Sequence, residues 1–151
     1  MPEETKSTLE INYNIKCEID TTPEGPSETW VDIGGIFSNL AISLNEVIVQ
    51  MSYLKDNGWG SSEVTGGQFT VTFTGHKRNG DPASDYLTSD AVMYDWGEAR
   101  KTKLRITCGE EQIVWSVTLA NITPAGGDAN QPNALTVTVH GNGAPNFEES
   151  T

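Results

Sequence analysis

Strict alternation of apolar and polar residues runs through several separate stretches of this chain. In the first of them, apolar side chains occupy every second position: Leu9, Ile11, Tyr13, Ile15, Cys17 and Ile19. Successive side chains of a strand point to opposite faces, so this period predicts strands with one buried and one solvated face. The same period recurs at 69–74, 104–108, 113–119 and 135–139.

The remaining segments complete a mainly β prediction. A short strand is expected at 30–33, and the β-branched content of 36–51 favours a strand over a helix there. Glycine and proline mark long loops at 55–67 and 123–133. The sum is about seven strands in a β-sandwich or open barrel, within one domain spanning 1–151. The polar ends, 1–8 and 146–151, are expected to form an N-terminal arm and a C-terminal tail.

One helix is predicted on the flank of this sheet, over about 82–95. Asp81 is the expected N-cap, and Pro82 suits the first helical position because its missing N–H is not needed there. Gly97 is a plausible end. Spacings of three and four residues place one apolar stripe against the sheet: Ala83, Tyr86, Leu87, Ala91 and Tyr94.

Charge and motifs narrow the classes of function. The formal net charge is −12, from 21 acidic and 9 basic residues, which argues against nucleic-acid binding because such binding requires cationic contacts to phosphates. No catalytic, phosphate-binding or metal-binding motif is present, so no enzyme activity and no cofactor are expected. Cys17 and Cys108 fall on apolar strand faces and are expected to be buried free thiols. No signal-like or membrane-spanning segment is visible, which favours maturation in the cytoplasm.

The centre of the chain carries a resemblance to a known family. A strand at 69–74 is followed by a glycine, a basic turn, the segment Gly-Asp-Pro-Ala-Ser-Asp-Tyr at 80–86 and the expected helix. This arrangement resembles the tail tube (major tail) proteins of long-tailed bacteriophages. The closing segment Gly-Asn-Gly-Ala-Pro at 141–145 is similar to that family's ending, and the turn at 75–86 resembles the non-contractile tails.

The resemblance implies a structural protein of the virion, assembled in the host cytoplasm. Its copies would form hexameric rings that stack into a hollow tube, through which DNA passes without specific binding. The implied partners are further copies of the chain and other tail proteins, namely the terminator, the tape measure and the distal tail protein. A membrane is not among them.

The loop at 55–67 matches by order the family's loop that contacts the next ring. Its tip reads Lys55, Asp56, Asn57, Gly58, Trp59 and Gly60. An exposed indole in a flexible loop is typical of an anchor for a partner, and a loop folded back so that Trp59 caps the core is the alternative.

Charge placement suggests two further surfaces. The polar face of the first strand is expected to face the lumen: Glu10, Asn12, Asn14, Lys16 and Glu18. Six of the nine cationic residues lie between Lys77 and Arg105, and Lys101, Lys103 and Arg105 are expected to contact an acidic surface of a neighbouring subunit. The alternative is two solvated faces without a partner.

A second function stays open at this point. Four tryptophans on an acidic all-β scaffold also suit a carbohydrate- or ligand-binding β-sandwich module: Trp30, Trp59, Trp96 and Trp115. The expected helix and the absence of clustered aromatics in the sequence favour the tube subunit.

Overall fold

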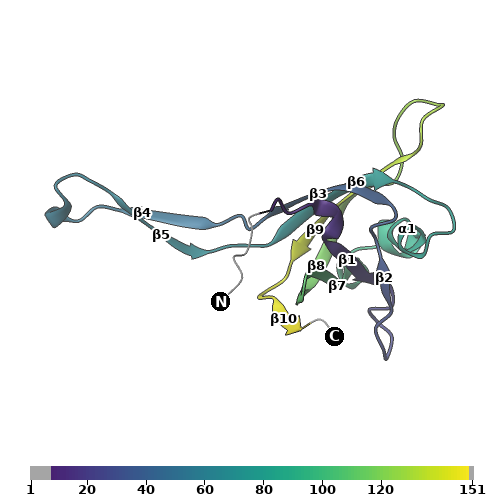
Figure 1. Ribbon diagram of the computed structural model, residues 1–151, viewed down its shortest axis with the longest axis horizontal. Helices are drawn as coiled ribbons and strands as arrows, with labels where there is room; N and C mark the ends of the chain where they lie inside the picture. The colour runs from purple at the N-terminus through teal and green to yellow at the C-terminus, as the bar shows by residue number, and fades with distance from the viewer. Residues whose placement is uncertain (1–7, 150–151) are drawn as a thin grey trace, which may run out of the picture.

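A computed structural model describes residues 8–149 and shows a mainly antiparallel β protein, which confirms the predicted fold class (Figure 1). The described residues form ten strands instead of about seven. Their bounds are β1 Lys16–Asp20, β2 Trp30–Asp32, β3 Phe37–Ser43, β4 Val47–Met51, β5 Ser61–Gly66, β6 Thr70–His76, β7 Lys101–Cys108, β8 Glu111–Thr123, β9 Ala134–Gly141 and β10 Asn146–Glu149.

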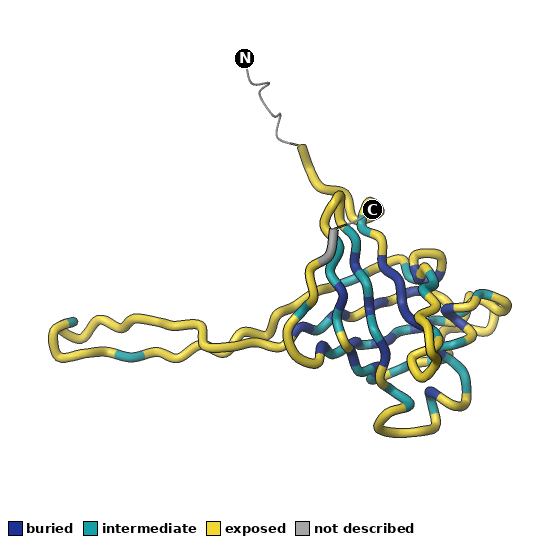
Figure 2. The backbone as a smooth tube through the Cα atoms, turned by 90° about the horizontal axis from the view of Figure 1, so that it is seen from below, coloured by how far each residue is buried: buried dark blue, intermediate teal, exposed yellow. Residues whose placement is uncertain are grey.

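Eight of these strands form one curved sheet, in the order β2-β1-β7-β8-β9-β6-β3, with β10 paired to β8 beside β9. Strand β8 joins the two halves of the sheet, because its first part pairs with β7 and its last part with β9. The apolar faces of both halves meet in one core, visible as the buried centre of the body in Figure 2. Its largest fully buried side chains include Phe73, Ile19, Leu87, Leu104, Leu119 and Leu135.

The predicted helix is two short helices, α1 Pro82–Leu87 and α2 Asp90–Met93. The cap is as predicted, because Asp81 Oδ1 accepts from the backbone N–H of Ala83 at 3.0 Å and of Ser84 at 3.2 Å. The single helix is wrong because Ser89 leaves the helical region with a ψ of 149°, and its hydroxyl donates to a backbone carbonyl instead. Beyond this break the buried residue is Val92, while Ala91 is exposed.

The first strand is shorter than its alternation predicts. A 3₁₀ turn, η1 Asn12–Asn14, interrupts the extended chain, and β1 begins only at Lys16. The N–H of Asn14 donates to the carbonyl of Ile11 at 3.0 Å, which closes the turn. Leu9 and Tyr13 are consequently 93% and 81% exposed, whereas Cys17 and Ile19 reach the core as predicted.

Two smaller expectations also change. Cys108 is exposed and Cys17 is buried, both as free thiols, because Cys108 ends β7 at the turn into β8. The C-terminal tail predicted at 146–151 contains strand β10, which pairs with the start of β8. Apart from Thr8, the predicted N-terminal arm lies outside the described residues.

Candidate assembly surfaces

The segment predicted as a long loop at 55–67 is largely a β-hairpin that projects from the body, and it is called here the arm, residues 44–68 (Figures 1 and 2). Strands β4 and β5 pair with each other and with no strand of the main sheet. The loop prediction is wrong for 61–66, because serine, threonine and valine there extend and pair with β4. An isolated two-stranded hairpin buries little surface, so nothing within the described chain covers either face of the arm.

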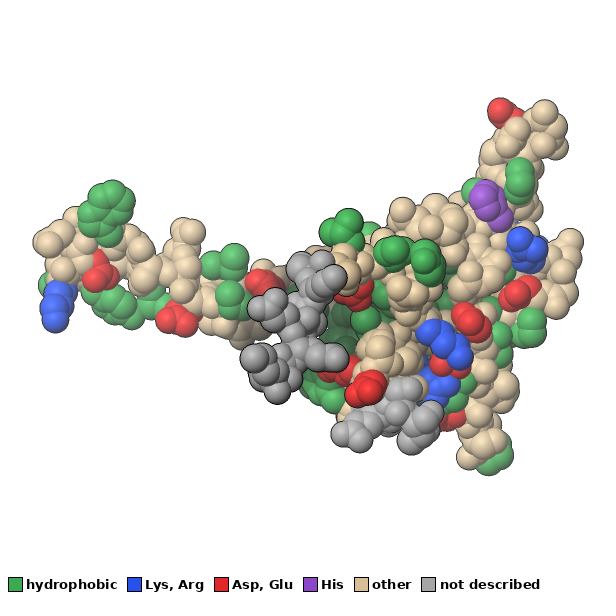
Figure 3. Space-filling view, in the orientation of Figure 1, with side chains coloured by type: hydrophobic (Ala, Val, Ile, Leu, Met, Phe, Trp, Pro, Cys, Tyr) green, Lys and Arg blue, Asp and Glu red, His purple; other side chains and the backbone are tan. Residues whose placement is uncertain are grey.

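Apolar side chains gather on this arm (Figure 3). Among the described residues, it carries eight of the fifteen exposed large apolar side chains: Leu44, Val47, Ile48, Val49, Tyr53, Leu54, Trp59 and Val64. Both faces of the ribbon contribute, because Ile48 opposes Val64 on one face and Val49 opposes Glu63 on the other. Contiguous exposed apolar surface of this kind marks an interaction site.

The tip of the arm is a short structured turn. The 3₁₀ turn η2 Leu54–Asp56 is closed by the Asp56 carboxylate, which accepts from the N–H of Tyr53 at 3.0 Å. Asn57 and Gly58 follow with φ values of 54° and 90°, which reverse the chain. Trp59 is 81% exposed, so the alternative in which it folds back onto the core is wrong.

The root of the arm is held by specific contacts with the body. The Asn45 amide Nδ2 donates to the carbonyl of Gln68 at 3.1 Å and to the Thr70 hydroxyl at 2.8 Å. A Cβ on Gly67 would lie 2.8 Å from the Leu44 carbonyl oxygen, so only glycine permits this close backbone approach. These contacts fix the direction in which the arm leaves the sheet.

The solvent face of β3, β6 and β9 has no charged side chain, and it is called here the hydroxyl face. These three strands contain no Asp, Glu, Lys or Arg, in a chain of 20% charged residues. Cross-strand pairs join Thr72 to Thr138 and Thr74 to Thr136. The face is made by Asn39, Ala41, Ser43, Thr70, Thr72, Thr74, Thr136, Thr138 and His140.

The two charged surfaces predicted separately meet in one ion pair. Glu18 and Arg105 are register partners on β1 and β7, and the guanidinium donates twice to the carboxylate, at 3.1 and 2.7 Å. The Arg105 guanidinium also lies 4.4 Å from the Trp30 ring centroid. Glu18 is only 8% exposed, so the prediction of an open acidic strand face that includes it is wrong. Opposite charges on adjacent strands pair instead of forming separate faces.

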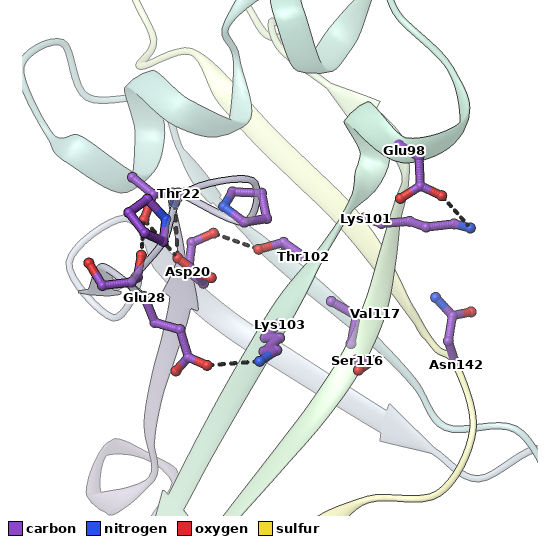
Figure 4. Close-up of a pocket in the computed structure, with 14 residues that line it drawn as sticks. Asp20, Thr22, Glu28, Glu98, Lys101, Thr102, Lys103, Ser116, Val117 and Asn142 are labelled. Atoms are coloured by element: carbon purple, nitrogen blue, oxygen red, sulfur yellow. Dashed lines mark hydrogen bonds and ion pairs between the residues drawn. The ribbon is translucent and has the colours of Figure 1, made fainter.

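The other two predicted interface cations are also paired. Lys103 Nζ bonds Glu28 at 2.8 Å and Lys101 Nζ bonds Glu98 at 3.3 Å, beside an open pocket under the loop between β1 and β2 (Figure 4). The hydrogen bond from Lys103 lowers the pKa of the Glu28 carboxyl. These pairs lie within one copy, so they are not by themselves evidence for a contact between subunits.

The four tryptophans lie on separate elements, on β2, at the arm tip, before the 3₁₀ turn η3 Gly97–Arg100 and on β8. Trp115 stacks on Phe69 with ring centroids 4.2 Å apart. They therefore do not build one aromatic platform for a sugar. In the part of the chain that the structure describes, no cluster of potential metal ligands occurs, and no helix has the length and apolar character needed to cross a membrane.

Comparison with known proteins gives matches in structure alone. Neither family models nor curated sequences match the chain. A chain from the tail of an empty gene transfer agent particle, solved with C6 symmetry, superposes with a TM-score of 0.71 at 14% identity, covering 93% of this chain and 99% of that one. The chain shares the fold of that chain.

Two contractile or tube-capping assemblies extend this likeness. A chain of the cap that terminates the anti-feeding prophage tube matches with a TM-score of 0.60 at 12% identity, over 99% of this chain and 97% of that one. A chain of the sheath-tube complex of an extracellular contractile injection system matches with a TM-score of 0.53 at 12% identity, over 91% and 90%. The fold therefore occurs in both tails and injection systems.

Proposed function

We propose that this protein is a structural subunit of a phage-type tail tube, in which copies form hexameric rings that stack into a hollow channel for DNA. The observation that carries the proposal is the apolar arm, which projects from a body with the fold of tail and tube chains. A large exposed apolar patch of this kind marks a surface that binds another protein surface. The role is architectural and non-catalytic.

The ends of the main sheet support ring formation. Strands β2 and β3 are its terminal strands, so each has one edge of unpaired backbone groups. Such edges pair readily with another chain, and a head-to-tail contact whose rotation closes produces a ring. The C6 symmetry of the similar gene transfer agent tail supports six copies in that ring.

The hydroxyl face is the proposed lining of the channel, in place of the partly buried first-strand face predicted from the sequence. It belongs to the half of the sheet that ends in the open edge of β3, so edge pairing would extend it around a ring. DNA-binding affinity comes largely from cationic side chains that neutralise phosphates and release their counterions. A face of hydroxyl groups without cations lacks this contribution, so DNA would pass along it without binding. Tubes carrying Thr72→Lys and Thr138→Lys should retain DNA in a sedimentation assay at low salt, while unaltered tubes should not. Equal retention would refute this lining.

The arm is the proposed contact between successive rings. The wider partners would be the terminator, the tape measure and the distal tail protein, with assembly in the host cytoplasm and residence in the virion. The solved neighbours include a contractile sheath-tube complex, so the assignment to a non-contractile tail rests on the sequence resemblance at 75–86.

Electron microscopy of the concentrated, untagged protein tests the proposal directly. Rings or tubes with a central hole are expected. The matched variant Ile48→Thr with Val64→Thr keeps β-branched residues in the arm but removes apolar surface, and it should leave rings that do not stack. Tyr94→Thr, which removes a 72% exposed side chain outside the arm, is the control and should stack normally. A protein that stays monomeric even with tail initiator proteins present would refute the tube function.

A further inference from the structure

A groove lies at the root of the arm, with a volume of about 850 Å³. Its walls are the arm root at 64–68 and the segment 141–145 that follows β9, and both are rich in glycine. Phe69 and Trp115 lie stacked in its lining, with their planes 8° apart. Glu46 lies at its rim and is exposed. The groove therefore combines an aromatic floor with a negative charge.

The tip of the arm has the complementary character. Leu54 and Trp59 are 102% and 81% exposed, and Tyr53 beside them is 63% exposed. Lys55 lies in this tip and is the only cationic residue in 44–68. The tip also contains Asp56, but its carboxylate accepts the N–H of Tyr53 within the turn. The apolar and aromatic tip with Lys55 therefore complements an aromatic groove that carries Glu46.

We infer that the arm tip of one copy docks in the arm-root groove of the next copy, with Lys55 facing Glu46. A paired hairpin rises about 3.4 Å per residue, so its tip cannot return to its own root and the contact joins two copies. The two surfaces differ, so the contact is heterologous and repeats from copy to copy. This inference rests on the proposed function and adds the surface that receives the arm.

Cross-linking tests this contact without requiring tubes to form. In a Cys108→Ser background, one variant carries Leu54→Cys at the tip and a second, of different mass, carries Ala144→Cys in the groove wall. Cys17 is buried with its pKa raised to about 11, so it does not compete for a maleimide. Mixing the two variants with a short bis-maleimide should give cross-linked heterodimer. The control mixes Leu54→Cys with Asp128→Cys, and we expect about tenfold less heterodimer from it, which corresponds to ~1.4 kcal/mol of binding free energy.

The outcomes separate the two proposals. Hollow tubes without the 54–144 cross-link would overturn the groove as the receptor and leave the tube function standing. The cross-link in solid filaments would support the docking and overturn the channel. Charge reversal gives a second measurement, because Lys55→Glu and Glu46→Lys should each reduce sedimenting polymer and their combination should restore it. Failure of the combination to restore polymer would overturn the Lys55–Glu46 contact.

Discussion

The pair formed by Arg105 and Glu18 provides a sharp test of the fold. Sequence reasoning treats Arg105 as a cation that faces a neighbouring subunit, so its reversal to glutamate should affect only assembly. In the structure, its side chain is 21% exposed and the Glu18 side chain is 11% exposed. We therefore expect Arg105→Glu to destabilise the isolated monomer.

The magnitude follows from what the guanidinium contacts. Removal of one partner from a largely buried ion pair costs about 3–5 kcal/mol, because the remaining charge loses its close contact. Glu18 would keep only the longer and more exposed contact with Lys16, at 3.9 Å. The residual exposure of both side chains places the expected loss at the lower end, about 3 kcal/mol. Loss of the contact between Arg105 and the Trp30 ring adds about 0.5–1 kcal/mol. A total near 4 kcal/mol is a large share of a stability of about 5–15 kcal/mol.

Urea unfolding of dilute monomer, followed by circular dichroism, measures this loss. Lys101→Glu is the matched control on the same strand, because its pair with Glu98 is 50% and 83% exposed, and it should change the free energy of unfolding by less than about 1 kcal/mol. The exchange Glu18→Arg with Arg105→Glu should recover at least half of the loss. A change below about 1 kcal/mol for Arg105→Glu would refute the view that this pair stabilises each monomer.

Three further measurements test other parts of the chain. Asp81→Ala removes the cap of α1 and should lower the free energy of unfolding by about 1 kcal/mol in urea titration, whereas an unchanged midpoint would contradict the cap. Gly75→Ala places a Cβ on the carbonyl oxygen of Ile36, so we expect a loss of at least about 3 kcal/mol or insoluble protein; a soluble variant of full stability would exclude this close approach. At pH 8, a thiol reagent should modify exposed Cys108 in the folded protein. Cys17 should react only after unfolding, because burial raises its pKa to about 11, and equal rates would count against its burial.

Local sequence patterns predicted the core strands and the start of α1 correctly. The alternation at 69–74, 104–108 and 135–139 predicted strands whose apolar side chains all face the core, except for exposed Cys108. The Asp81-Pro82 pair predicted the helix start, because capping depends on residues two and three positions away. The same local logic could not reveal that extended backbone at Ser89 would separate α1 from α2.

The candidate assembly surfaces depend on contacts between residues that are far apart in the sequence. Glu18 and Arg105 are 87 positions apart, and only the pairing of β1 with β7 makes them partners. The arm was missed because its strand at 61–66 lacks alternating apolar residues. The run of three apolar residues at 47–49 was the available signal, since a strand with one buried face would alternate there. The sequence by itself determined the core strands with clear alternation, the helix cap and the acidic charge, because each depends on neighbouring residues or on a sum. The tertiary structure decided which charges neutralise each other, which polar strands share the hydroxyl face and which apolar strands leave the body, because strand order and register bring distant residues together.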